Sequence, residues 1–249
     1  MSYGEPMCGR YATSKSSADL SELFEALDAT PGLEPDYNVA PTDPVPVVRV
    51  SARREARVLE VARWGLLPPW ARDPREGARL INARAETVAT SRAFATSFER
   101  RRCLVPADGW YEWVRRDAAG SRPAKQPYFM TLPDGGPLVF AGLWTVWGEG
   151  DGRALTCGIV TTAAVGDLAL VHDRMPLVLP RQRWADWLAG PPDPALLAPT
   201  PEDLVAGLEI RPVGPAVGDV RNDGPDLVSR VAAPPLGAPP EDPVPLALF

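Results

Sequence analysis

Short apolar-rich stretches, some of them alternating with polar residues, recur along the chain and are separated by Gly- and Pro-rich turns. Alternation is typical of β-strands, because successive side chains of a strand point to opposite faces of a sheet. The pattern predicts strands at about 45–50, 56–64, 103–106, 110–114, 127–132, 137–147, 154–161, 177–179 and 208–213. The polar, basic stretch 115–126 is expected to form a hairpin loop.

Helical spacing is confined to a few segments. Leu20, Leu23, Phe24 and Leu27 recur at this spacing after Ser16, which forms a capping-box pattern with Asp19, and Pro31-Gly32 is expected to end the helix. Further short helices are expected around Phe94 and Phe98, at about 164–170 and 180–189, and after Thr200. Because no βαβ rhythm joins the strands, the pattern predicts an α+β fold with antiparallel sheets.

Composition places the chain among ordinary globular proteins. It has 249 residues, 45% hydrophobic and 23% charged, which suits one large domain or two small ones. No apolar run approaches the roughly 18 residues of a membrane span, and the first six residues lack a signal-peptide pattern, so a cytoplasmic location and no membrane partner are expected. From about residue 231 onward Pro, Ala and Gly dominate, which predicts a disordered tail at 231–249.

Metal and disulfide chemistry is disfavoured by the count of cysteines and histidines. The chain has three scattered cysteines, Cys8, Cys103 and Cys157, without a CxxC pair, and a single histidine, His172. Neither a disulfide framework nor a zinc site is indicated, so no metal and no cofactor are expected. The net charge of −6 further restricts any nucleic-acid site to a local basic patch.

The most suggestive chemistry lies in the stretch Met7-Cys8-Gly9-Arg10-Tyr11. Removal of Met7, by initiation there or by cleavage of a leader, would expose Cys8 with a free α-amine beside its thiol. Such an aminothiol condenses with an aldehyde through its amine and closes a thiazolidine ring through its thiol. Alternatively, Met7 is an ordinary internal residue and Cys8 a small buried hydrophobe.

Three other residues are candidates for proton transfer or positioning. His172 lies in a polar His-Asp-Arg run and could move protons near neutral pH. Glu112, between aromatic residues, is either an ordinary solvent-facing carboxylate or one in partly apolar surroundings, where a raised pKa would suit general acid–base catalysis. Asn82, flanked by Ile81 and Ala83, could orient an amine or bond the backbone.

Arginines and tryptophans could bind a nucleic acid. Arg10, Arg84 and Arg174 could form an anion site, although each could equally be a surface charge. Trp70 and Trp113 could stack on nucleobases, or could belong to the core.

Taken together and in order, these segments resemble the SRAP (SOS response-associated peptidase) family of abasic-site processing proteins. The resemblance covers about residues 7–228 and is carried by Met7–Tyr11, Tyr37-Asn38-Val39-Ala40-Pro41-Thr42, Trp64-Gly65-Leu66, Ile81–Thr87, Cys103–Trp113, Phe140–Trp144 and His172–Pro176. It implies a single domain, residues 7–230, of antiparallel sheets with a barrel-like core and short surrounding helices. Residues 1–6 would then be a leader or precede the true start.

The resemblance also implies a function. The protein would bind single-stranded DNA containing an abasic site and cross-link to it covalently, as a monomer. Cys8 would be the nucleophile, Asn82 would orient its amine, and Glu112 and His172 would transfer protons. Arg10, Arg84 and Arg174 would hold phosphates, while Trp70 and Trp113 would contact bases.

One departure from the family pattern affects this interpretation, because family members usually begin Met-Cys whereas seven residues precede Cys8 here. Either Met7 is the start, or the leader is removed, or the chain cannot form the thiazolidine. The protein could remove the leader itself, through its thiol, Glu112 and His172. Two alternatives stay open: a cysteine peptidase acting on other proteins, and a non-covalent module that binds single-stranded DNA.

Overall fold

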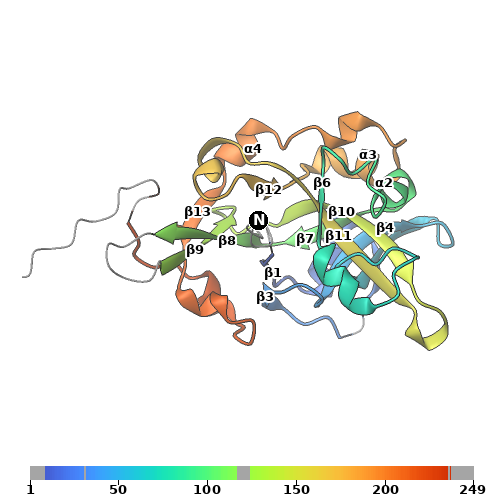
Figure 1. Cartoon of the computed structure of the whole chain (residues 1–249), viewed down its shortest axis with the longest axis horizontal. Helices are drawn as coiled ribbons and strands as arrows, with labels where there is room; N and C mark the ends of the chain where they lie inside the picture. Colours follow the sequence, from blue (N-terminus) through green and yellow to red (C-terminus); the bar gives the residue numbers. More distant parts are fainter. Residues whose placement is uncertain (1–8, 31, 117–123, 235, 237–249) are drawn as a thin grey trace, which may run out of the picture.

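A five-stranded barrel forms the centre of the molecule in the computed structural model, which describes residues 9–30, 32–116, 124–234 and 236 (Figure 1). Its strands follow one another around the barrel in the order β11 (Ala154–Ala163), β10 (Leu138–Trp147), β7 (Arg102–Ala107), β4 (Pro44–Ser51) and β5 (Ala56–Trp64). These neighbours pair antiparallel, and a parallel pairing of β11 with β5 closes the ring. Closure removes the sheet edges that β-proteins must otherwise protect.

Three short strands extend the barrel sheet. β2 (Leu27–Ala29) runs parallel to β5, β6 (Asn82–Arg84) runs parallel to β11, and β12 (Arg174–Pro176) pairs antiparallel with β11. β6 and β12 therefore both pair with the same strand, close to Thr161.

A second sheet of five antiparallel strands packs against the barrel. Its order is β13 (Glu209–Pro212), β9 (Ala124–Thr131), β8 (Gly109–Arg116), β1 (Tyr11–Thr13) and β3 (Asp36–Val39). Trp110 and Tyr128 of this sheet share one buried cluster with Trp64, Phe140 and Ile159 of the barrel. The main core therefore lies between the two sheets.

Short helices and 3-10 turns lie between the strands along the chain. The α-helices are α1 (Ser17–Phe24), α2 (Ala95–Arg100), α3 (Trp184–Ala189) and α4 (Glu202–Ala206). The 3-10 turns are η1 (Pro74–Arg79), η2 (Gly150–Gly152), η3 (Gly166–Leu170), η4 (Arg181–Arg183), η5 (Pro194–Leu197), η6 (Pro215–Gly218) and η7 (Pro225–Val228). No helix among the described residues is long and apolar enough to cross a membrane.

The first predicted helix begins as expected but ends early. Ser16 caps it by accepting the backbone N–H of Asp19. The helix stops at Phe24 because Glu25 adopts a left-handed conformation with φ of 51°. Leu27, which was predicted to lie on its apolar face, starts β2 instead and is half exposed.

The predicted α+β fold with antiparallel sheets and a barrel-like core is confirmed, with three parallel pairings as exceptions. The predicted strand at 177–179 is reduced to a single bridge between Val178 and Phe140. The segment 164–170 contains a 3-10 turn rather than an α-helix. The boundaries at residues 6, 230 and 231 stay predictions, and residues 1–8 and 237–249 lie outside the described part of the chain.

Candidate functional site

Glu112 is a buried carboxylate, so the solvent-facing interpretation of this residue is wrong. The residue is 5% exposed and lies on β8 opposite Tyr128 of β9. Period-two alternation places it on the same face as Trp110 and Val114, which pack into the cluster between sheet and barrel. Tyr111 and Trp113 point to the other face, where they pack with Phe129.

The chain just before β1 continues alongside β8. Tyr11 pairs with Trp110 across the β1–β8 ladder, and the backbone N–H of Tyr111 donates to the carbonyl of Arg10 at 3.0 Å. Continuing this antiparallel register by two residues brings Gly9 opposite Glu112. Cys8, the predicted nucleophile, lies outside the described residues, and Gly9 is its immediate neighbour in the chain.

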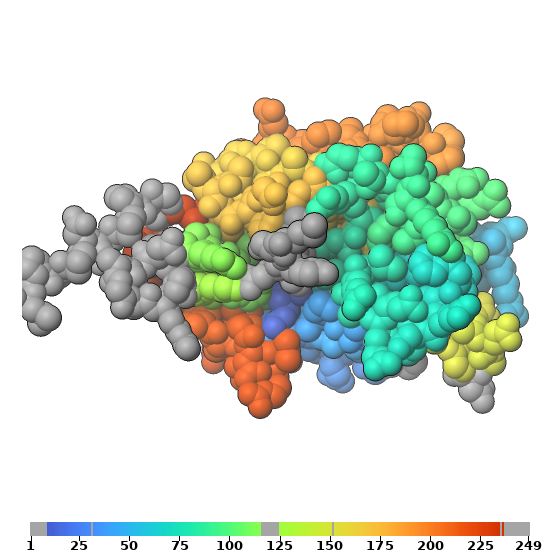
Figure 2. All heavy atoms as spheres, in the orientation of Figure 1, coloured from blue at the N-terminus to red at the C-terminus, as the bar shows by residue number. Residues whose placement is uncertain are grey.

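Gly9 also lines a surface groove of about 550 Å³. Its other lining residues include Arg10, Pro41, Trp113, Lys125, Pro127 and Val220. In Figure 2 the dark blue start of the described chain is visible between the green, orange-red and lighter blue parts of the surface. The groove therefore combines an apolar wall, an indole ring and two cationic side chains beside the start of β1.

Asn82, Arg84 and Arg174 are brought together on both sides of β11. Asn82 pairs with Ile159 and Arg84 with Thr161 on the parallel side, whereas Arg174 of β12 pairs with Ala163. Asn82 is partly buried and Arg84 is exposed. The residues adjoining them, Ile81 and Met175, belong to the same core cluster as Trp110 and Tyr128, so this edge of the barrel meets the β8 face that carries Glu112.

Arg174 is held by acceptors from two other segments. Its guanidinium forms a bidentate ion pair with Glu86, which follows β6, and Nη2 also donates to the carbonyl of Thr161 at 2.7 Å. The Arg174 side chain is only 11% exposed. The ion pair with Arg174 lowers the pKa of Glu86.

His172 precedes β12 in the same segment. Its Nδ1 accepts the backbone N–H of Arg174 at 3.0 Å and lies 2.9 Å from a carboxylate oxygen of Asp173. An unprotonated Nδ1 accepts the first contact, whereas a protonated one donates to the second. The ring is partly exposed.

Arg10 has a structural role that its sequence context does not indicate. Its Nη1 donates to Asn38 Oδ1 and, at 2.9 Å, to the carbonyl of Val217. The amide of Asn38 in turn donates to the carbonyls of Asp219 and Asn222. Arg10 and Asn38 thus hold the segment 217–222 beside the groove, and burial lowers the pKa of the Arg10 guanidinium.

Trp70 lies in the loop after β5 and is 46% exposed, so it is not a core residue. The guanidinium of Arg92 stacks on its ring at 4.7 Å from the centroid. Trp113, by contrast, is partly buried and lines the groove.

Comparison with known proteins identifies the family. The model of the SOS response associated peptidase (SRAP) family matches residues 7–220. The chain belongs to the SRAP family. It is 35% identical over 237 residues to the abasic site processing protein YedK of Escherichia coli, covering 90% of this chain and all of that one. It is 34% identical over 230 residues to YoqW of Bacillus subtilis, also called an abasic site processing protein, covering 89% and 99%.

Solved structures share the fold. A protein of Bacteroides thetaiotaomicron superposes with a TM-score of 0.74 at 21% identity, covering 90% of this chain and all of that one. A phage-related protein of Bordetella bronchiseptica has a TM-score of 0.64 at 32% identity, covering 83% and 94%.

Four residues in or beside this candidate site were not among the sequence candidates: Glu86, Asn38, Lys125 and Arg92. Glu86 and Asn38 lie inside the quoted motifs, so the signal that could have found them was present. Lys125 is one of two lysines in a chain rich in arginine. Nothing in the sequence indicates that Arg92 stacks on Trp70.

Proposed function

We propose that this SRAP-family chain processes abasic sites by forming a covalent cross-link between Cys8 and the lesion in single-stranded DNA. The observation that carries the proposal is the β1–β8 register, which is observed as far as Arg10 opposite Tyr111; continued by one residue, it would put Gly9, the neighbour of Cys8, beside the buried Glu112. The names of the relatives YedK and YoqW support the choice of substrate.

The chemistry needs Cys8 as the first residue. A free α-amine has a pKa of about 7.7–8.0, so part of it is unprotonated at neutral pH and can attack the aldehyde of the ring-opened abasic sugar. Loss of water gives an imine. The thiol then adds to the imine carbon while its proton passes to the nitrogen, which closes a thiazolidine.

The surrounding residues have distinct roles in this proposal. Asn82 orients the amine, Glu112 moves protons during ring opening and imine formation, and His172 acts as a second acid or base, including in reversal. Arg84 and Arg174 hold the phosphates on either side of the lesion. Their common position beside Thr161 supports this role.

The groove beside Gly9 would accept the DNA around the lesion. Trp113 contacts a base, Trp70 stacks on another farther along the strand, and Arg10 with Lys125 supplies positive charge. Because Arg10 also binds carbonyls of the segment 217–222, it positions the groove wall as well as the phosphate. A local patch of this kind is compatible with a net charge of −6.

Two forms of the protein test the proposal: one that starts at Met7, from which methionine aminopeptidase removes Met7, and one that starts at Met1. Each is incubated with abasic single-stranded DNA and run on a denaturing gel, after intact-mass measurement of its N-terminus. The form with Cys8 first should give a shifted band that Cys8→Ala abolishes. A form with residues 1–7 still attached should give none, and cross-linking after incubation would indicate self-processing.

Cys157→Ala is the matched control. Cys157 is buried, and burial raises the pKa of its thiol to about 12, so this variant should cross-link like the wild type. Binding without a band that survives denaturation would replace the proposal with a non-covalent module. Peptide hydrolysis without any cross-link would replace it with a cysteine peptidase.

A further inference from the structure

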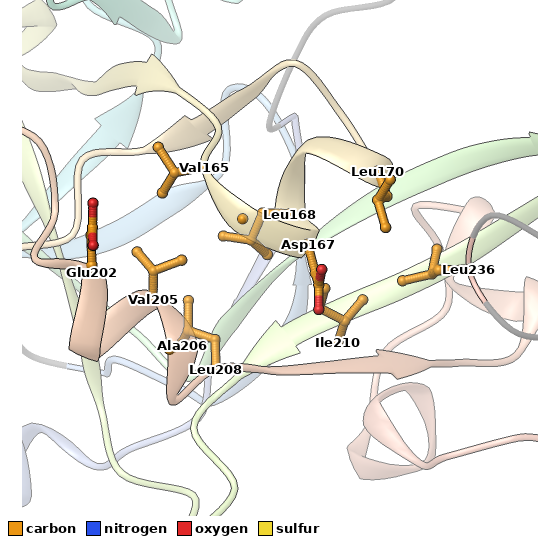
Figure 3. Close-up of a pocket in the computed structure, with 11 residues that line it drawn as sticks. Val165, Asp167, Leu168, Leu170, Glu202, Val205, Ala206, Leu208, Ile210 and Leu236 are labelled. Atoms are coloured by element: carbon orange, nitrogen blue, oxygen red, sulfur yellow. The ribbon is translucent and has the colours of Figure 1, made fainter.

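An apolar groove separate from the candidate site lies between η3, α4 and the edge strand β13 (Figure 3). It has a volume of about 910 Å³ and a lining that includes Val165, Leu168, Leu170, Val205, Leu208 and Ile210. Within this lining Leu170 is 56% exposed, so part of the apolar wall faces solvent. The two charged groups in the lining are carboxylates, Asp167 and Glu202.

The chain itself leads into this groove after residue 230. Arg230 forms an antiparallel bridge with Val213, and the N–H of Val231 donates to the carbonyl of Pro212 at 2.9 Å. Continuing in this direction follows the outer edge of β13 from Pro212 toward Leu208. Leu236 accordingly lies in the groove lining, at the end opposite Glu202 and near Ile210 and Leu170 (Figure 3).

The sequence that follows Leu236 has a second apolar tract. Val244, Leu246 and Leu248 alternate with Pro245 and Ala247, and Phe249 follows. Proline favours an extended backbone, in which Val244, Leu246 and Leu248 would share one face. The seven residues 237–243 can span up to about 25 Å, and Gly237 permits the chain to turn back over the groove.

We propose that residues 244–249 dock into this groove in cis, with Val244, Leu246 and Leu248 against its apolar wall. Leu236 is an example of a leucine from the same segment that packs there. Docking would also restrain η3, because Leu168 of this turn lines the groove. The carbonyl of Leu168 accepts the N–H groups of Val171 and His172 at 3.0 and 3.1 Å, which connects the turn to His172. The tail would thereby steady the turn that positions His172.

The response to salt distinguishes docking of the chain's own tail from binding of a basic partner peptide. Glu241 and Asp242 of the tail carry the same sign as Asp167 and Glu202, so docking in cis relies on apolar burial and should tighten as salt rises. A basic partner peptide would be attracted by the same carboxylates and should bind less tightly as salt rises.

Hydrogen–deuterium exchange on the full chain without DNA tests the proposal. Leu246→Asp should accelerate exchange at 166–170 and 205–208 by about tenfold, because the cover over these amides is lost. Ala247→Asp introduces the same charge on the opposite face of the tail and should leave exchange unchanged. Leu170→Asp, at an exposed position of the groove, should reproduce the effect of Leu246→Asp.

Equal exchange in the wild type and in all three variants would overturn the proposal. Protection that increases with protein concentration would assign the groove to a second copy instead. Protection that appears only on adding an Arg- and Leu-containing peptide, and that salt abolishes, would assign it to a basic partner. None of these outcomes depends on cross-linking, so failure here leaves the proposed function untouched.

Discussion

Arg174 binds Glu86 through two parallel hydrogen bonds, 2.6 Å from Nη1 to Oε1 and 2.9 Å from Nη2 to Oε2. This geometry fixes the plane of the guanidinium as well as its position. It also connects the segment after β6 to β12; β6 carries Asn82 and Arg84, and β12 carries Arg174. The two motifs, 88 residues apart in sequence, are therefore parts of one arrangement.

Glu86→Gln tests whether this pair positions Arg174. We expect cross-linking to abasic DNA to slow several-fold, because Arg174 loses a charged anchor. The loss in free energy of unfolding should stay below about 1 kcal/mol, because the Glu86 side chain is 52% exposed. Glu99→Gln, which removes an exposed partner of Arg100, is the control. Unchanged cross-linking in Glu86→Gln would show that Arg174 needs no such anchor.

Loss of the buried Arg102 side chain should destabilise the fold at a place away from the candidate site. It is 5% exposed and donates to the carbonyls of Phe98, Trp187 and Gly190, which joins α2 to the end of α3. Arg102→Met leaves these buried acceptors without their donor and should lower the free energy of unfolding by about 2–4 kcal/mol in urea denaturation. Arg100→Met, at an exposed position, should change it by less than about 0.5 kcal/mol.

Two buried tyrosines should respond differently to loss of their hydroxyl. Tyr111 Oη donates to the carbonyl of Tyr37 at 2.7 Å, whereas the buried hydroxyl of Tyr11 has no hydrogen-bond partner among the described residues. Tyr111→Phe should therefore cost about 0.5–1.5 kcal/mol, and Tyr11→Phe should be neutral or stabilising. Thermal melts of the two variants measure this difference. Equal losses would contradict the assignment.

Protonation of Glu209 should contribute to unfolding of the protein in acid. Hydrogen bonds from Arg211, together with the nearby Arg230, lower the pKa of Glu209 below its ordinary 4.5. A lowered pKa in the folded state means stability that is fully present above 4.5 and is lost as pH falls through the folded value. Glu209→Gln should therefore be less stable than the wild type at pH 7, and the gap should close toward pH 2. A gap independent of pH would refute this linkage.

Local structure could largely be predicted from the sequence, for physical reasons that particular elements illustrate. The strand 56–64 is recovered with both ends correct, because a stretch rich in Val, Leu and Ala continues until Gly65 and the Pro-rich turn interrupt it. The start of α1 follows from a side-chain cap within three residues. Its end does not, because the left-handed Glu25 and the pairing of Leu27 with β5 depend on contacts with distant strands.

In the candidate site, too, the sequence determines local features and the tertiary structure determines the rest. The ordered motifs identify the SRAP family and its candidate site residues, because each motif is a short continuous stretch of sequence. Alternation shows that Glu112 and Trp113 face opposite ways, but only packing against the barrel decides that the carboxylate is the buried one. Closure of the barrel through β11 and β5, the Arg174–Glu86 pair and the role of Arg10 likewise depend on tertiary structure, because they join residues far apart in the chain.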